Sequence, residues 1–123
     1  MPFERFSLDD TSRWDKGDWY NASACTNMTA ALQIVASAGA GNYHYISSIH
    51  VSSPSAQLFT ITDGTSATIT QFYSQALTPL EIQFPRGMER RCPNVGQNIK
   101  MKSDVSASVY YTIAGFYYPW IAT

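Results

Sequence analysis

Charge is the scarcest property of this chain of 123 residues. Asp, Glu, Lys and Arg make up 14% of it, against about 25% in a typical globular domain, and Ser and Thr fill many polar positions instead. The net charge of −1 offers no basic surface that would attract nucleic acid or an anionic membrane. We therefore expect neither of them as a partner.

Long apolar runs and cysteines are also scarce. No run approaches the roughly 20 residues that a membrane span needs, and the segment Met1–Asp10 has acids where a signal peptide has a basic start and an apolar run. We therefore expect the chain to be made and kept in a cytosol, where thiols stay reduced. Cys25 and Cys92 lack the CxxC spacing of a zinc site, and we expect them to be free thiols.

Motifs of catalysis are missing as well. The sequence contains no GxSxG, HExxH, phosphate loop or dinucleotide fingerprint. His44 and His50 share one face of a regular strand but lie about 20 Å apart along it, too far to hold one metal ion. Asp63 is the single formal charge in residues 21–80, and we expect a solvated carboxylate there rather than half of a paired-carboxylate site. The sequence predicts no enzymatic activity, no cofactor and no small-molecule substrate.

The sequence is rich in segments typical of strands. Seven of them combine β-branched and aromatic residues, and most alternate apolar with polar positions. They are Ala31–Ser37, Tyr43–Ser53, Gln57–Thr62, Ala67–Tyr73, Leu80–Phe84, Asn98–Lys102 and Ser106–Tyr118. The first of them overlaps Thr29–Ala36, which could also form a helix. This spacing predicts an all-β fold, an antiparallel β-sandwich or jelly roll of about seven to eight strands over residues 25–123, with residues 1–24 as an N-terminal arm or capping segment.

The stretch LFTITDGTSATITQF suggests a hairpin around Asp63-Gly64. A tight two-residue turn would place apolar residues of one strand opposite threonines of the other. A slip by one residue exchanges the two faces, so we expect Phe59 opposite Ile69 and Ile61 opposite Ala67, with a loop of three or five residues that contains Asp63-Gly64. The outer face would then be a polar, uncharged ladder of threonines.

The last predicted strand, SVYYTIAGFYY, is apolar on both faces. A strand covered on one side only should alternate apolar with polar residues. Either the tyrosine hydroxyls reach solvent while their rings lie on the surface, or the outer face packs against a neighbouring subunit, where aromatic residues are enriched. In the second interpretation Tyr110, Phe116 and Tyr118 lie at a subunit interface.

Two further segments are candidates for contact with a partner. The stretch Arg13–Asn21 carries both signs of charge with Trp14, Trp19 and Tyr20, and it is either a loop that caps the sandwich or an arm that docks on a neighbour with its tryptophans as anchors. The stretch Phe84–Pro93 is either a solvated loop or a patch that meets an acidic partner through its three arginines, Arg86, Arg90 and Arg91.

Three stretches together carry a family resemblance. They are TAALQIVASAGAGNYHYISSIHVSSPSAQLFTITDGTSATITQFY, PLEIQFPRG and NIKMKSDVSASVYYTIAGFYY. In strand order, in the Gly/Ala-rich entry to the second strand and in the Asp-Gly hairpin, the chain from Thr26 to Tyr118 resembles small virion proteins of tailed bacteriophages, of the capsid decoration or cement type. These proteins have a jelly-roll β-sandwich and often form trimers on the outside of the capsid.

The resemblance implies a structural virion protein that binds the outside of a phage head and stabilises contacts between major capsid subunits. It implies a homotrimer, with the major capsid protein as partner and the capsid surface as location after synthesis in the host cytoplasm. The tryptophan-bearing segment and the arginine loop would contact the capsid. A carbohydrate-binding or host-adhesion module, or a tail or neck component, are the alternatives.

We predict that neither metal nor a disulfide supports the fold, because the histidines and cysteines lack ligand spacing. Adding a chelator or a reductant should leave the melting temperature, measured by circular dichroism, unchanged within a degree or two. A large drop with either reagent would contradict this.

Overall fold

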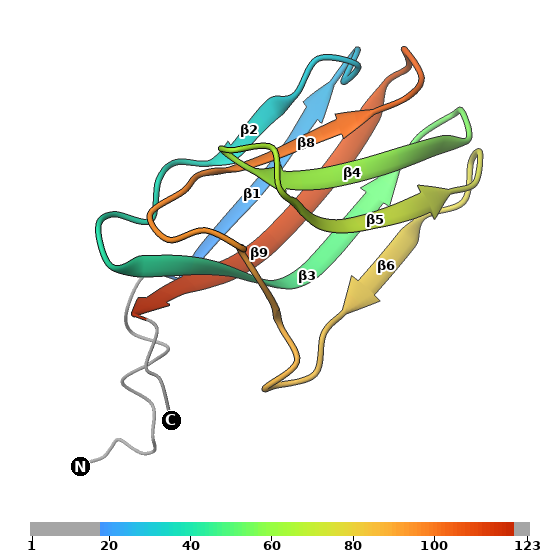
Figure 1. Cartoon of the computed structure of the whole chain (residues 1–123). Coiled ribbons are helices and arrows are strands. Elements are labelled where there is room, and N and C mark those ends of the chain that lie inside the picture. The colour runs from blue at the N-terminus through green and yellow to red at the C-terminus, as the bar shows by residue number, and fades with distance from the viewer. Residues whose placement is uncertain (1–17, 120–123) are drawn as a thin grey trace.

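Two antiparallel sheets and no helix make up residues 18–119, the part of the chain that the computed structural model describes (Figure 1). The strands are β1 (Trp19–Cys25), β2 (Leu32–Val35), β3 (Asn42–Ser52), β4 (Gln57–Asp63), β5 (Thr68–Ser74), β6 (Leu80–Gln83), β7 (Arg90–Arg91), β8 (Ile99–Ser103) and β9 (Val109–Pro119). One sheet has five strands in the order β1-β9-β3-β6 with β7 also paired to β3, and the other has the order β2-β8-β4-β5. The predicted antiparallel β-sandwich is confirmed.

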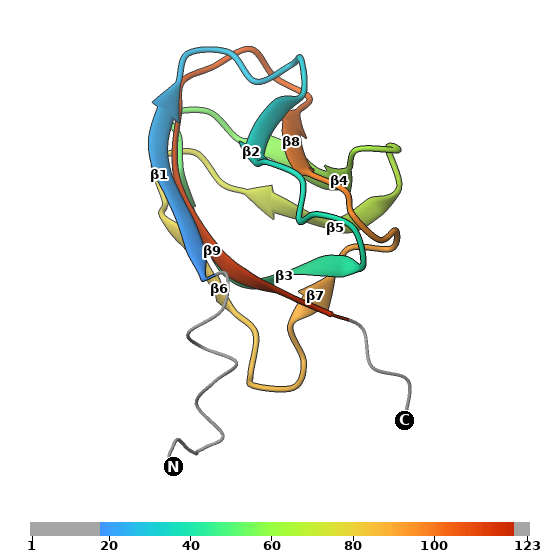
Figure 2. The same ribbon diagram turned by 90° about the vertical axis from the view of Figure 1, so that its left-hand side faces the viewer.

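The pairing of the strands is nested. β4 pairs with β5, β3 with β6, β2 with β8 and β1 with β9, all antiparallel. Such nested pairs form when one long hairpin rolls up and its successive strand pairs fall alternately into the two sheets. This arrangement is the jelly roll. Figure 2 shows the two sheets facing each other with the inner faces turned toward a shared core.

The core follows from alternation along the strands. Inward-facing apolar residues recur at every second position and are almost completely buried. They include Val51 in β3, Phe59 and Ile61 in β4, Ile99 and Met101 in β8, and Val109, Tyr111 and Ile113 in β9. Burying each such side chain contributes about 1.5–3 kcal/mol to the stability of the fold. The packing of these side chains between the two sheets is therefore the main interaction that holds the sheets together.

An extra residue interrupts the alternation in β3. Its register on β9 shifts between Ile46 and Ser48, so Ser47 has no partner of its own, and the Ser47 hydroxyl donates a hydrogen bond to the carbonyl of Ala114 at 3.1 Å. The prediction that His44 and His50 share a face was therefore wrong. The bulge turns His44 into the core, where it is 2% exposed, while the His50 side chain is 50% exposed.

The N-terminal boundary of the sandwich also needs correction. β1 pairs with β9 at all seven of its residues, from Trp19 opposite Gly115 to Cys25 opposite Val109. Residues 19–24 of the predicted arm therefore belong to the five-stranded sheet. Trp14 and the rest of residues 1–17 lie outside the described part of the chain.

Two smaller elements differ from expectation. The segment that could have been a helix is strand β2, paired with β8 and bulged between Gln33 and Val35, so the helical alternative is wrong. The loop Phe84–Pro93 contains the short strand β7, which pairs with Tyr45 and Ile46 of β3.

The hairpin is present, but its predicted register is wrong. Phe59 lies opposite Phe72, with ring centroids 5.3 Å apart, and a shift between Ile61 and Thr62 leaves Ile69 as an extra residue in β5. Ile69 and Phe72 are three residues apart, so only a bulge lets both pack against the core. The loop is not a two-residue turn, but it has four residues, 64–67, and Asp63 is the last residue of β4, so the predicted loop of three or five residues that contains Asp63-Gly64 is also wrong.

Asp63, expected to be a solvated carboxylate, is fully buried. Its Oδ1 accepts hydrogen bonds from the backbone of Thr65 at 2.8 Å, the Thr65 hydroxyl at 2.6 Å and the backbone of Ala67 at 3.1 Å. Its Oδ2 accepts one from Nδ2 of Asn94 at 2.8 Å. Burial by itself raises the pKa of this carboxyl, but the hydrogen bonds from Thr65, Asn94 and Ala67 outweigh burial and lower the pKa below its ordinary value.

We predict that Asp63→Asn costs about 2 kcal/mol of unfolding free energy at neutral pH, because the new amide donor would face the Asn94 amide without an acceptor. A lowered pKa in the folded state stabilises the fold above the ordinary Asp pKa of about 3.9, and this contribution disappears as the pH falls through the lowered value. The difference in unfolding free energy between the wild type and Asp63→Asn, measured by urea unfolding, should therefore become smaller in acid.

Asp104→Asn is the control, since Asp104 is exposed and accepts one hydrogen bond, from the backbone of Leu58 at 2.8 Å. It should change stability by less than about 0.5 kcal/mol. Equal losses for the two variants would contradict the role given to Asp63.

Candidate contact surface

The outward-facing residues of β1 and β9 are uncharged, and the nearest charge is Asp18, which lines a hollow beside Tyr20 and Ala114. Tyr20 lies opposite Ala114, Ala22 opposite Thr112, and Ala24 opposite Tyr110. Both tyrosines project from this face, Tyr20 being 75% and Tyr110 60% exposed. We call these six residues the tyrosine face. Exposed aromatic rings beside small and hydroxyl-bearing residues can bury apolar area without removing a charge from water.

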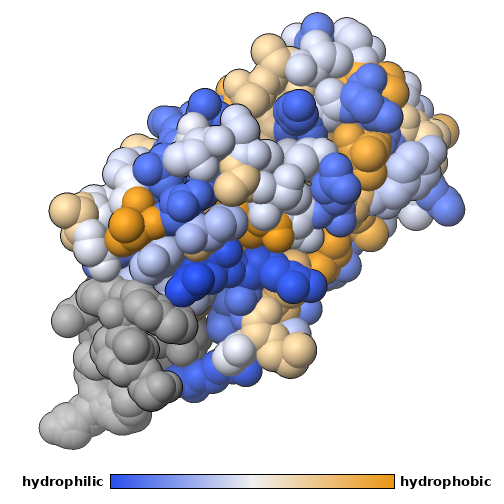
Figure 3. Space-filling view, in the orientation of Figure 1, coloured by the Kyte–Doolittle hydropathy of each residue, from blue (hydrophilic) through white to orange (hydrophobic). Residues whose placement is uncertain are grey.

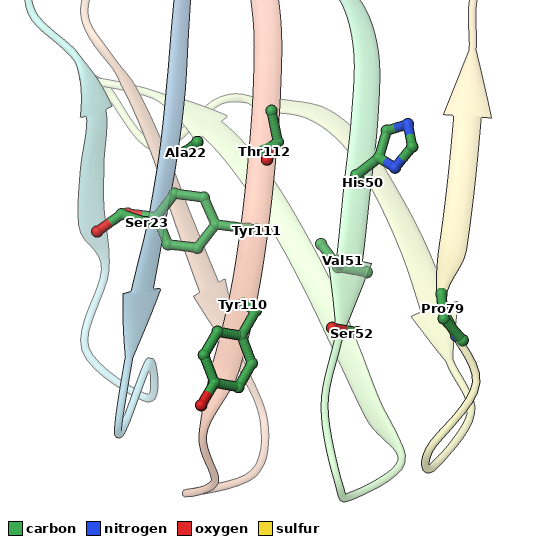
Figure 4. Close-up of a pocket in the computed structure, with 9 residues that line it drawn as sticks. All are labelled: Ala22, Ser23, His50, Val51, Ser52, Pro79, Tyr110, Tyr111 and Thr112. Atoms are coloured by element: carbon green, nitrogen blue, oxygen red, sulfur yellow. The ribbon is translucent and has the colours of Figure 1, made fainter.

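A groove of about 300 Å³ runs across this part of the sheet. Its lining residues come from β1, β9, β3 and the segment that precedes β6, and Figure 4 shows them, with Tyr110 and Thr112 on β9 and His50 on β3. On the β6 side, Nε2 of His50 lies 3.1 Å from Oε2 of Glu81. The groove is therefore bordered by a polar pair on one side and by the tyrosine face on the other.

A second groove, of about 420 Å³, continues around Tyr110 to the end of the sandwich. It is lined by Pro54, Leu77 and Pro79 as well as Tyr110. Leu77 is 80% exposed and has a φ of +59°, which costs energy for a residue with a side chain. A hydrogen bond from its N–H to the carbonyl of Ser53, at 2.8 Å, holds it there. Sequence patterns did not identify Leu77, since a left-handed backbone leaves no signature in a loop of mixed composition.

The four-stranded sheet has a different outer face. The predicted threonine ladder is present there as Thr60, Thr62 and Thr68, but Lys100 and Lys102 of the neighbouring strand β8 lie in the same shallow depression. Figure 3 shows this side of the molecule, where hydrophilic and intermediate residues dominate and the hydrophobic ones form small separate spots. The tyrosine face carries no charge, whereas this depression carries two lysines, so the tyrosine face is the better contact surface.

The three predicted subunit-interface residues have different surroundings. Tyr110 is exposed, whereas Phe116 is only 3% exposed and its ring stacks on Tyr45 with centroids 5.0 Å apart. Tyr118 is half-buried. Phe116 therefore has almost no surface left for a neighbour, because its ring already packs within the chain.

Trp19, predicted as a capsid contact, packs within the sandwich instead. It crosses the inner face beside Gly115, where a Cβ would come 2.7 Å from Cζ2 of the indole, and its ring meets His44 edge-on at 5.5 Å. Nε2 of His44 donates to the carbonyl of Ala36 at 2.7 Å, and burial lowers the pKa of this histidine despite that bond. His44 is therefore neutral at physiological pH.

The three predicted arginines differ in how tightly they are held. Arg90 lies over the ring of Phe84 at 5.2 Å, and Arg91 lies over the ring of Tyr43 at 4.4 Å, both favourable cation–π distances. Arg86 and Arg90 are exposed, and Arg91 is half-buried. The structure does not bring these arginines together with Tyr20, since they lie around β7 beyond β3 whereas Tyr20 is on β1.

The two thiols are free, as predicted. Cys25 is half-buried and its Sγ donates to the carbonyl of Asn27 at 3.1 Å. Cys92 is fully buried, and burial, with the negative charge of Asp63 as a second cause, raises its pKa to about 12. Between residues 18 and 119, no three His, Cys, Asp or Glu side chains come together as a metal site, and no helix is long and apolar enough to cross a membrane.

Comparison with known proteins adds little. No protein-family model and no curated protein matches the chain. Among solved structures, an insecticidal delta-endotoxin, Cry8Ea1 from Bacillus thuringiensis, matches over 85% of this chain with 8% identity and a TM-score of 0.43, and the chain spans only 19% of the toxin. The virus-like particle of the extra small virus of the prawn Macrobrachium rosenbergii matches over 82% of this chain and 79% of its own, with 7% identity and a TM-score of 0.37. Likenesses this weak carry no argument about function.

We predict that the two thiols react at very different rates. A chromogenic disulfide reagent at pH 8 should modify Cys25 rapidly, and Cys92 only when the protein is unfolded, because a buried thiol with a raised pKa has almost no thiolate. The absorbance of the released chromophore should show that one thiol per chain reacts fast in buffer and two thiols per chain react fast in denaturant. Cys25→Ser should remove the fast phase, and two fast equivalents in the native protein would contradict the burial of Cys92.

Proposed function

We propose that the chain is a structural virion protein, a capsid decoration protein that binds the outside of a phage head and stabilises contacts between major capsid subunits. The observation that carries the proposal is the tyrosine face, with Tyr20 and Tyr110 exposed on an uncharged part of the sheet. Tyrosine is enriched where protein surfaces meet, and charged residues are depleted at the centre of such contacts.

The fold supports the same proposal. Jelly rolls occur in viral capsid proteins and in lectins, and a closed sandwich provides a rigid platform on which flat surfaces can meet. The groove around Leu77 and Pro79 adjoins Tyr110, so apolar area continues from the sheet onto the end of the sandwich. A protruding loop of the major capsid protein that carries apolar side chains is the partner that such a surface fits.

The carbohydrate-binding alternative makes a different demand on Tyr110. A sugar-binding platform needs an aromatic ring surrounded by amides and carboxylates that pair with sugar hydroxyls. The described residues that line the two grooves at Tyr110 are instead Ser, Thr, Ala, Val, Leu, Pro, Tyr and His, and the carboxylate at the border of the first groove, Glu81, lies against His50. This composition favours contact with protein, so decoration is the function that we propose.

The proposal predicts that Tyr110→Glu reduces binding to heads at least tenfold, because a charge at the centre of an apolar contact must be desolvated. The chain would be added to heads assembled from the capsid proteins of the same genome, and the head-bound fraction measured after density-gradient centrifugation. The wild-type protein should sediment with heads, in fixed proportion to the capsid protein.

Gln71→Glu is the matched control, since Gln71 is exposed on the outer face of the four-stranded sheet. It should bind heads like the wild type. Recovery of the wild-type chain only with tails, or only in the unbound fraction, would refute the decoration role. Equal losses for both variants would show that the tyrosine face is not the contact.

A further inference from the structure

Among the described residues, 18–119, β1 is an edge strand without the features that usually protect edges. It lies at the end of the five-stranded sheet with β9 as its partner. It pairs with β9 through all seven residues without a register shift, and its sequence, WYNASAC, contains no charge, proline or glycine. A long, regular, uncharged edge offers a row of backbone groups to another strand.

The other edges of the described sandwich are protected. β2 and β5 are both bulged. At the far side of the five-stranded sheet, β6 has four residues including Glu81, and β7 consists of two arginines. Bulges, charges and shortness are the means by which sheet edges avoid further pairing. Of the edge strands that the structure describes, only β1 lacks all three, which marks this edge as one that pairs.

We propose that β1 pairs with β1 of a second copy of this chain, antiparallel about a two-fold axis, to join two five-stranded sheets into one. The parity of the register restricts where this axis can lie. Residues that lie opposite each other in a strand pair project to the same face of the sheet. The outer faces of the two copies therefore lie on the same side of the joined sheet only if each outward-facing residue lies opposite another outward-facing residue. This requires a two-fold axis that passes through a residue and not between two residues. The axis through Ala22 pairs all seven residues of both strands.

This register is complementary in side-chain size. It places Tyr20 of one copy opposite Ala24 of the other, and Ala22 opposite itself. Ala24 in turn lies beside Tyr110. Each exposed Tyr20 ring would therefore cover a small residue of the second copy next to an exposed tyrosine. This self-complementarity is why a second copy fits the edge better than an unrelated strand does.

The proposal differs from the homotrimer that the family resemblance implies, because a two-fold contact closes as a dimer. It stands independently of any role on a capsid. Light scattering from the full-length protein at micromolar concentration should give about 27 kDa, twice the 13.7 kDa of one chain. A mass of one or three chains would overturn it.

Two substitutions test the register. Ala22→Lys would place two lysines opposite each other and should give a monomer with an unchanged far-UV spectrum, whereas Gln75→Lys, in an exposed loop, should remain a dimer. In a Cys25→Ser background, Ala22→Cys should form a disulfide-linked dimer under mild oxidation. Ala24→Cys should not, because its two copies would be about 13 Å apart. A dimeric Ala22→Lys protein, or equal cross-linking at both positions, would overturn the register.

Discussion

The bulge in β3 is the constraint on which the five-stranded sheet depends. Ile46 and Ile49 are three residues apart, so a regular strand would bury one and expose the other. The extra residue at Ser47 lets both face the core, where both are fully buried. β3 pairs with β9, β6 and β7. The bulge at Ser47 therefore also affects which residues of these three strands face the opposite sheet.

Alternation in the sequence was enough to predict the sandwich and most of its strands, but not the registers. The assumption of strict alternation failed at the bulged strands β3 and β5. Ile69 and Phe72 repeat the three-residue spacing of Ile46 and Ile49, and in hindsight apolar residues at this spacing within a strand are the signal of a bulge. Which residue is extra still depends on the opposing strand, and a single strand's sequence contains no information about that.

The first strand was missed for a related reason. Mixed charges just before Trp19 made the segment resemble an arm. Trp19 is paired with Gly115 of the neighbouring strand, and a side chain at Gly115 would collide with the carbonyl oxygen of Tyr45 and with the indole. The absence of a side chain at Gly115 leaves room for the indole of Trp19, which is 96 residues earlier in the chain. The sequence alone does not show that these two residues are neighbours.

The candidate contact surface combines features that the sequence could predict with one that it could not. Tyr20 and Tyr110 were both expected to make contacts, but in separate roles, and only the pairing of β1 with β9 puts them on one face. The same pairing leaves the other side of β1 as the regular edge of the sheet. An unprotected strand edge and a cluster of exposed aromatic rings both favour association with another protein surface. Their concentration on β1 and β9, while lysines occupy the opposite sheet, is what gives this sandwich one side suited to assembly.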